Sequence, residues 1–223
     1  KRNPSSELVS YYGSHNTSNK VRNQIEWSKH SKEEVWTEIV TEKIRKQKEL
    51  LESLGKEEAG LLDSYLNEIG WNDETNREGH AAKVYFNALF GLSFTRTSDC
   101  LINTALNYGY SIILSAFTRE ITASGYITQL GLFHDNMFNH FNLASDLMEP
   151  FRILIDREVN RMVFDEFTHT EKMRLVNVLN QEVIIDGKKQ YVNNAIKIYC
   201  KSIFDALNEN DSALIRFYKL NEL

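Results

Sequence analysis

Glu78, His134, Asp146 and Glu149 carry the side chains of this sequence that best suit a metal site. A glutamate, a histidine and a second carboxylate together favour a divalent cation. Carboxylate oxygens are typical ligands of Mg²⁺ or Mn²⁺, and one imidazole shifts the preference toward Mn²⁺. The separations of 56 residues (134 − 78) and 15 residues (149 − 134) have no meaning in helix geometry. The pattern alone therefore does not bring the histidine to either glutamate.

Glu78 has a structural alternative to metal binding. It shares one face of an expected helix with Tyr85 and Leu89, and a carboxylate that faces a core needs a partner. Thr75 and Glu78 also have the spacing of a capping box, in which Glu78 would bond the backbone at the start of the helix. Both roles stay open on the local sequence.

The other three candidates also have structural alternatives. Asp146 and Glu149 are spaced i, i+3, so they share one helical face. Near the start of a helix the macrodipole favours such acids without any functional role. His134 follows an apolar run, where a histidine is often a hydrogen-bonded structural residue. The sequence contains no Gly-rich phosphate loop, zinc spacing or Gly-x-Ser-x-Gly nucleophile motif.

The charge distribution limits where nucleic acid could bind. The 223 residues include 26 basic and 31 acidic side chains, a formal net charge of −5. Residues 1–48 carry ten basic and six acidic side chains (+4), and residues 49–223 carry sixteen and twenty-five (−9). A uniformly basic nucleic-acid-binding domain is excluded. The best local cluster is Lys43, Arg45, Lys46 and Lys48, although interleaved acids favour a solvated helix face there.

The elements that must position these residues are predicted to be mainly α-helical. Two prolines and ten glycines interrupt long segments with apolar residues at helical spacing. A short strand is predicted at 5–12, and Pro150 falls in the second turn of one helix, where it removes a backbone donor. The predicted helices span residues 35–54, 57–69, 75–91, 99–124, 143–163 and 193–208, and a hairpin with an Asp186-Gly187 turn spans 183–192.

The expected domain organisation has three parts. Residues 1–13 are the tail of an N-terminal β domain that is missing from the sequence, 14–19 form a polar linker, and 20–223 form the helical domain. No run of about 18 uncharged apolar residues occurs. The sequence has no signal-peptide pattern, and Cys100 and Cys200 have no partner spacing. These features predict a cytoplasmic protein without membrane contact.

Four blocks occur in order along the sequence: 77–86 with Leu89-Phe90-Gly91, 103–110, 131–134 and 142–152. Together they resemble the CRISPR-associated adaptation integrase, the Cas-one (Cas1) family. In that family they correspond in order to the segment with the first metal ligand, the long central helix, the histidine loop and the terminal acidic helix. Weaker similarity covers nearly the whole chain, and the hairpin resembles the form found in type II-A systems. The resemblance implies the helical catalytic domain of that family.

The resemblance assigns roles to individual residues. It implies that Glu78, His134 and Glu149 are the catalytic metal ligands, with Asp146 as an auxiliary acid. Many family members have aspartate where Glu149 stands, and glutamate is compatible with the type II form. Arg152, Lys83 and Arg77 are the candidate phosphate or DNA contacts. Arg152 has the alternative of an ordinary intramolecular ion pair.

The resemblance also implies an activity and partners. The activity is a Mg²⁺- or Mn²⁺-dependent DNA endonuclease and integrase of antiviral defence, which inserts short foreign DNA into a CRISPR array by transesterification. The partners are double-stranded DNA, both foreign DNA and CRISPR repeat, and a Cas-two dimer. A homodimer is implied for the full-length protein, with contacts that depend on the β domain. Because an imidazole must be neutral to bind metal, activity should fall below about pH 6.

Two alternatives remain. One is a helical interaction or scaffold module in which the acids only cap helices, and a lack of Mn²⁺ binding would favour it. The other is a transposon-encoded homologue of the same integrase, which is expected to carry a further DNA-binding domain after the helical one.

Overall fold

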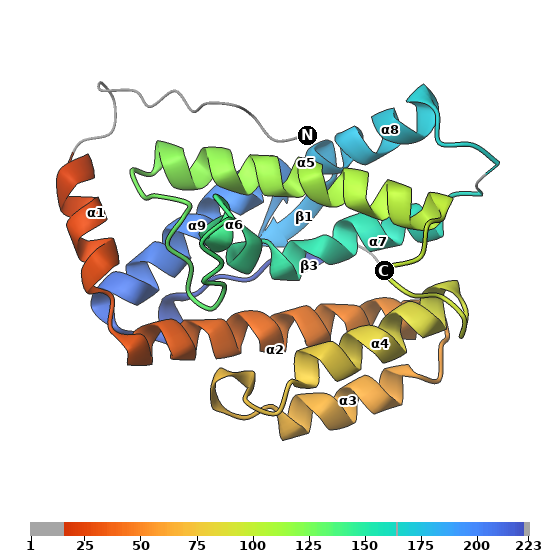
Figure 1. Cartoon of the computed structure of the whole chain (residues 1–223), viewed down its shortest axis with the longest axis horizontal. Coiled ribbons are helices and arrows are strands. Elements are labelled where there is room, and N and C mark those ends of the chain that lie inside the picture. The colour runs from red at the N-terminus through yellow and green to blue at the C-terminus, as the bar shows by residue number, and fades with distance from the viewer. Residues whose placement is uncertain (1–15, 164, 221–223) are drawn as a thin grey trace.

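The computed structural model describes residues 16–163 and 165–220 of the chain. These residues form a mainly α-helical domain with a small antiparallel sheet near the C-terminal end (Figure 1). The predicted fold class is therefore confirmed. The strand predicted at 5–12 lies outside the described residues. No described helix is both long enough and apolar enough to cross a bilayer.

Two helices begin the described part of the chain. α1 (Thr17–Glu26) starts inside the range 14–19 that was expected to be a linker, so residues 17–19 of that range are helical. α2 (Lys29–Ser53) begins before the predicted position 35. Its start is explained by Ser28, whose side-chain oxygen accepts the backbone N–H of Ser31 at 3.0 Å.

α3 (Ala59–Glu68) and α4 (Arg77–Phe90) pack against α2 and against each other. The predicted capping box of Thr75 and Glu78 is wrong. The carboxylate of Asp73, in the 3₁₀ helix η1 (Trp71–Asp73), accepts the backbone N–H groups of Arg77 (2.7 Å) and Glu78 (3.0 Å) instead. The Glu78 side chain is consequently available for a contact outside its own helix.

α5 (Leu101–Ala123) is the second long helix, and α6, α7 and α9 lie between it and α2 in Figure 1. α5 packs on α7 (Arg152–Asn160), α8 (His169–Val176) and α9 (Val192–Glu209). A Cβ at Gly109 would lie 2.4 Å from Cγ2 of Ile155. Glycine at this position therefore permits the close approach of α5 and α7.

The helix predicted over 143–163 is interrupted at Pro150. α6 (Asn142–Leu147) is followed by the 3₁₀ helix η2 (Glu149–Phe151) and then by α7. Proline lacks the N–H that would continue the i to i−4 ladder. Asp146 and Glu149 therefore do not share one regular helix.

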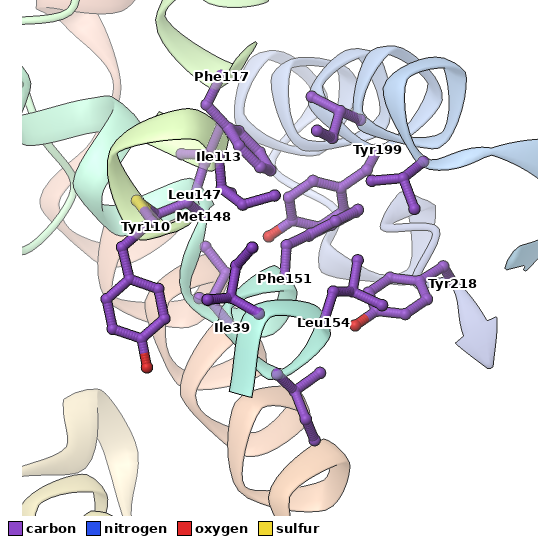
Figure 2. Packing of buried hydrophobic residues seen from close by; sticks show 14 of the residues in the cluster. Ile39, Tyr110, Ile113, Phe117, Leu147, Met148, Phe151, Leu154, Tyr199 and Tyr218 are labelled. Carbon is purple, nitrogen blue, oxygen red and sulfur yellow. The ribbon is translucent and has the colours of Figure 1, made fainter. Parts of the chain in front are cut away.

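Phe151 fixes this interrupted segment in the core (Figure 2). Its ring is fully buried and lies 5.2 Å from the ring of Phe117, 5.3 Å from Tyr199 and 4.5 Å from Tyr218. Burying one such side chain contributes about 1.5–3 kcal/mol. Because Phe151 follows Glu149 by two residues, this packing also positions the acid.

The predicted hairpin is confirmed. β1 (Glu182–Ile185) and β2 (Lys188–Tyr191) pair antiparallel with Ile185 opposite Lys188. The turn residues Asp186 and Gly187 have φ values of 51° and 70°, as an Asp-Gly hairpin turn requires. β3 (Lys219–Leu220) adds a third strand in the order β2-β1-β3.

α1 and α8 were not predicted from the sequence. Thr168 and Glu171 do carry a capping signal for α8, because the Glu171 carboxylate accepts the Thr168 backbone N–H at 2.8 Å. α9 confirms the last predicted helix. The remaining 3₁₀ helices are η3 (Asn177–Asn180) and η4 (Ser212–Leu214).

Candidate active site

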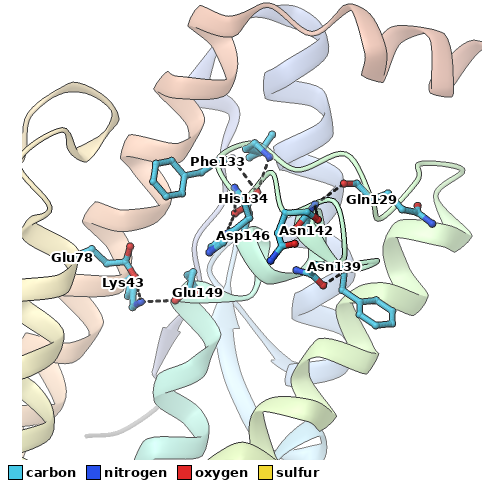
Figure 3. Close-up of polar contacts among 12 residues, drawn as sticks. Lys43, Glu78, Gln129, Phe133, His134, Asn139, Asn142, Asp146 and Glu149 are labelled. Carbon is cyan, nitrogen blue, oxygen red and sulfur yellow. Dashed lines mark hydrogen bonds and ion pairs between the residues drawn. The ribbon is translucent and has the colours of Figure 1, made fainter. Parts of the chain in front are cut away.

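Glu78 on α4 and Glu149 on η2 converge on the ammonium group of Lys43 on α2 (Figure 3). Lys43 Nζ lies 2.5 Å from Glu78 Oε1 and 2.5 Å from Glu149 Oε2. The Lys43 side chain is 11% exposed and that of Glu149 is 5% exposed. Two acids from distant parts of the sequence therefore meet at one position that holds a positive charge, called here the cation position.

The charges at this position support one another. Burial by itself raises the pKa of Glu149, but neighbouring Arg152 and Lys43 lower it to about 2. Burial likewise opposes the charged form of Lys43, but Glu149 and Glu78 raise its pKa above the usual value. Glu149 and Lys43 are consequently both charged near neutral pH.

Arg152 holds Glu149 from the other side. Its Nη2 donates to Glu149 Oε1 at 2.9 Å, and its guanidinium lies 4.8 Å from the centre of the Tyr110 ring. The intramolecular ion pair that the sequence left as an alternative for Arg152 is therefore present. The same side chain also lines a cavity beside the cation position.

His134 is oriented by Asp146, which is fully buried on α6. His134 Nδ1 hydrogen-bonds Asp146 Oδ1, and the Asp146 carboxylate also accepts the backbone N–H groups of Leu132 (2.6 Å), Phe133 (3.1 Å) and His134 (3.2 Å). Both Asp146 oxygens are thus engaged by the histidine loop. With Nδ1 bonded to a carboxylate, Nε2 is the ring nitrogen available to a ligand.

The histidine loop approaches Asp146 closely because residue 131 is glycine. A Cβ at Gly131 would lie 2.3 Å from the His134 carbonyl oxygen and 2.8 Å from Asp146 Oδ2. On the other side, the Phe133 ring stacks on Trp36 of α2, with centroids 4.5 Å apart. The hydrogen bond to Asp146 raises the pKa of His134 above its usual value. The imidazole therefore gains its proton at a higher pH than an unperturbed imidazole does.

The structure brings two of the three predicted metal ligands into contact with the same positively charged group, the ammonium of Lys43. Glu78 and Glu149 share the cation position, whereas His134 is bonded to Asp146 (Figure 3). Within residues 16–163 and 165–220, no three His, Cys, Asp or Glu side chains are placed to hold one metal ion. The three-ligand centre therefore stays a prediction. The donor set still suits Mg²⁺, which commonly takes one or two protein carboxylates and completes its shell with water and substrate phosphate.

The basic cluster on α2 is not a solvated DNA-binding strip. Lys43 is buried at the cation position, and Lys46 is 2% exposed, 3.3 Å from Glu42 and 2.8 Å from Glu49. The remaining pairs are Arg45 with Glu42, and Lys48 with Glu52 and Asp63. Both interpretations from the sequence are wrong for Lys43 and Lys46, because helix packing buries them.

The other two candidate DNA contacts are Arg77 and Lys83 on α4. Arg77 Nη1 pairs with Glu68 at 3.1 Å, and Lys83 is exposed on α4. Neither residue lines the cavity beside the cation position. Their contact with DNA stays a prediction.

Asp156 is a residue near the site that the sequence analysis did not single out. It is 2% exposed on α7 and accepts hydrogen bonds from the hydroxyl groups of Tyr85 (2.9 Å) and Tyr110. Burial raises its pKa to about 6, although the two tyrosine hydroxyls oppose this shift. Its spacing from Arg152, i to i+4, was the available sequence signal, because it places the acid on the same helical face as that arginine.

Comparison with known proteins identifies the family of the chain. The family model described as CRISPR associated protein Cas1 matches residues 6–183. The CRISPR-associated endonuclease Cas1 of Neisseria meningitidis serogroup C is 34% identical over 189 residues, which are 82% of this chain and 62% of the relative. A Cas1 endonuclease of Francisella tularensis subsp. novicida is 30% identical over 59% of this chain and 45% of its own length.

Solved structures show the same fold at low sequence identity. A partial Cas6-RT-Cas1–Cas2 complex matches with a TM-score of 0.77 at 17% identity, over 95% of this chain and 76% of the matched chain. A casposase bound to an integration product matches with a TM-score of 0.73 at 20% identity, over 87% and 70%.

A helical domain in which buried Glu149 and partly exposed Glu78 meet at one cation defines a candidate active site. The chain belongs to the Cas1 family. It spans less than two thirds of the length of these two curated relatives.

Proposed function

We propose that this chain provides the catalytic domain of a divalent-metal-dependent DNA endonuclease and integrase of CRISPR adaptation. The convergence of Glu78 and Glu149 on one cation position carries this proposal. Family membership supports it, because matched Cas1 relatives are named endonucleases. The proposed reaction joins the 3′ hydroxyl of a short foreign DNA to a CRISPR repeat by transesterification.

Glu78 and Glu149 would hold Mg²⁺ or Mn²⁺ at the cation position in place of the Lys43 ammonium group. A bound divalent ion there would stabilise negative charge on the phosphodiester and promote ionisation of the attacking hydroxyl. Arg152 keeps Glu149 ionised and oriented through the 2.9 Å contact. Asp146 fixes the His134 ring, so a neutral His134 would offer Nε2 to the site.

The proposed partners follow from the family and from the charge balance. A Cas1–Cas2 complex is among the structures with this fold, and we propose double-stranded DNA and a Cas2 dimer as partners here. Residues 49–223 carry a net charge of −9 (16 − 25), so part of the positive surface for DNA would come from the partner protein. We also propose that the full-length protein forms a homodimer.

The test is Mn²⁺-dependent cleavage or joining of DNA by the protein and three variants. Glu78→Gln and Glu149→Gln should each lose activity by about 100-fold or more. His134→Ala should also lose turnover while keeping its helical circular dichroism. Glu49→Gln is the matched control, because Glu49 pairs with Lys46 away from the cation position, and it should remain active.

Two results would contradict this proposal. Full activity of Glu78→Gln would remove Glu78 from the site. Absence of Mn²⁺ binding in isothermal titration, with no cleavage by the protein, would favour a helical scaffold without catalysis.

A further inference from the structure

The chain that follows α9 packs on α2 and α9 and then joins the sheet. Residues 211–220, called here the C-terminal strap, include η4 and β3. The Ser212 hydroxyl donates to Glu34 Oε1 on α2 at 2.7 Å, and the Arg216 backbone N–H donates to Ser202 Oγ on α9 at 3.0 Å. The strap is therefore held in place by two helices as well as by the pairing of β3 with β1.

Tyr218 of the strap contacts the segment that carries Glu149. Its side chain is fully buried, and its hydroxyl donates to the backbone carbonyl of Pro150 at 2.9 Å. Its ring also packs on that of Phe151, with centroids 4.5 Å apart (Figure 2). One side chain therefore contacts both residues that follow Glu149, although it lies 68 positions after Pro150 in the sequence.

The Glu149 segment depends on such contacts because its own backbone is weakly held. η2 is only three residues long, and 3₁₀ helices have poorer hydrogen-bond geometry than α-helices. Pro150 also has no backbone N–H to donate. Burial of Phe151 is a non-directional interaction, whereas a hydrogen bond fixes the direction of the carbonyl that accepts it. The Tyr218 hydroxyl is therefore suited to set the orientation of the backbone beside Glu149.

The orientation of this backbone decides where the Glu149 carboxylate lies. Glu149 contacts Lys43 at 2.5 Å and Arg152 at 2.9 Å, and its side chain is 5% exposed. A buried side chain with two such partners has little freedom to compensate for a shift of its backbone. Since a misplacement of about 1 Å at a catalytic group can lower turnover about 100-fold, a small movement of η2 would affect the cation position.

We infer that Tyr218 is a positioning residue for Glu149, which it holds at the cation position through the hydrogen bond to Pro150. The inference rests on the proposed function, because it takes the cation position as the metal site of that reaction. Tyr218 does not line the cavity beside the cation position, so it acts on Glu149 only through the backbone.

The test compares Tyr218→Phe with a matched variant, Tyr199→Phe. Tyr199 is also fully buried, and its ring lies 5.3 Å from that of Phe151. Its hydroxyl has no hydrogen-bond partner within residues 16–163 and 165–220. Both variants therefore remove one buried hydroxyl beside the same phenylalanine, but only Tyr218→Phe removes a bond to the Glu149 segment. Circular dichroism should show unchanged helicity in both.

The first measurement is proton exchange of the Lys43 ammonium group, followed by nitrogen NMR in the metal-free protein. This group bonds Glu149 directly, so its protection reports how firmly the carboxylate is held. Exchange should be at least about threefold faster in Tyr218→Phe and unchanged in Tyr199→Phe. A residue that only fills the core would lower the melting temperature without this selective effect on Lys43.

The second measurement is Mn²⁺ binding by calorimetry together with Mn²⁺-dependent DNA cleavage. In Tyr218→Phe the Kd for Mn²⁺ should rise about fivefold, and kcat should fall about tenfold at a fixed Mn²⁺ concentration with KM for DNA unchanged. Raising the Mn²⁺ concentration should restore part of kcat, because the defect lies in a metal ligand. Tyr199→Phe should match the original protein in Kd, kcat and KM.

Two outcomes would overturn the inference. One is a Tyr218→Phe variant whose Lys43 exchange and Mn²⁺ affinity equal those of the original protein, which would make Tyr218 a core residue only. The other is an equal change in both variants, which would assign the effect to a loss of packing around Phe151.

The same measurements separate this inference from the proposed function. Faster Lys43 exchange in Tyr218→Phe alone, in a protein that neither binds Mn²⁺ nor cleaves DNA, would support the positioning of Glu149 and remove the enzyme proposal. Full metal-dependent activity with no selective effect of Tyr218→Phe would do the reverse.

Discussion

Asp146 and Glu149 are buried acids only three residues apart, yet the protein neutralises them in different ways. Asp146 bonds three backbone N–H groups and the ring of His134. Glu149 bonds the side chains of Lys43 and Arg152. Backbone donors cannot leave without unfolding the loop, whereas the Lys43 side chain can rotate away.

The comparison shows that burial of an acid does not by itself indicate its role. The contacts make Asp146 an anchor for the histidine loop, whereas Glu149 bonds the lysine side chain that the proposed metal ion would replace. Asp156 is a third case, because two neutral hydroxyl groups bond it and its pKa rises to about 6. The predictions below test this difference.

Asp146→Ala should have the largest effect on stability. The variant leaves three backbone N–H groups and His134 without their acceptor, so we expect the free energy of unfolding in urea to fall by about 4 kcal/mol. Amide exchange at Leu132 and Phe133 should accelerate as the loop loosens. Asp135→Ala, an exposed acid in the same loop, should change stability by less than about 0.5 kcal/mol. Equal effects of the two variants would contradict the anchor role.

Asp156→Asn should change how stability depends on pH. An unfolded aspartate ionises near pH 3.9, but folded Asp156 keeps its proton until about pH 6. Between these values the folded state binds more protons than the unfolded state, so this group lowers stability as pH rises, by about 3 kcal/mol in total.

That contribution should disappear in Asp156→Asn. The measurement is the difference in unfolding free energy between the variant and the original protein at pH 4 and pH 7, because contributions of other groups then cancel. A pH-independent difference would contradict the raised pKa.

Lys43→Met should strengthen Mn²⁺ binding. If Lys43 competes with a metal for Glu78 and Glu149, its removal should lower the Kd for Mn²⁺ in calorimetry about tenfold, or about 1.4 kcal/mol. Lys46→Met is the matched control, because Lys46 is also buried on α2 but bonds Glu42 and Glu49. A weaker Mn²⁺ affinity in Lys43→Met would show that the lysine is not an exchangeable partner.

Tyr85→Phe and Tyr110→Phe should have the smallest effects. Each variant removes one hydrogen bond to Asp156 and should lower the free energy of unfolding by about 1 kcal/mol. Since these bonds lower the pKa of Asp156, each variant should move its titration to higher pH, as carboxyl NMR shifts would report. A titration that moves to lower pH would contradict this role of the phenols.

Local patterns in the sequence predicted most of the fold. The apolar spacing predicted α2 to α5 and α9, and the Asp186-Gly187 pair predicted the β1–β2 turn, because these signals act within one element. The start of α4 was mispredicted. Asp73 lies before the Thr75–Glu78 pattern, and its carboxylate accepts the backbone N–H of Arg77 at the start of α4. The residue before Arg77, Asn76, has a left-handed backbone conformation.

The candidate site was less accessible to sequence reasoning. Resemblance to a family drew attention to Glu78, His134 and Glu149, but periodicity could not predict that Lys43 lies between the two glutamates. The sequence placed Lys43 in a basic cluster on a helix. Its burial could not be predicted there, because it depends on the packing of α4 and η2 against α2. The acceptor role of Asp146 likewise requires the glycine-permitted approach of the loop at Gly131.

The sequence by itself determined the helical class, the hairpin, the interruption at Pro150 and the supply of acids and a histidine. All of these follow from residue types over a few neighbouring positions. Only the tertiary structure decided which acid pairs with which cation. That choice depends on long-range contacts: Lys43 and Glu78 are 35 positions apart in the sequence, and Lys43 and Glu149 are 106 positions apart. Burial in such contacts sets both the charge of a side chain and the partner that it can accept.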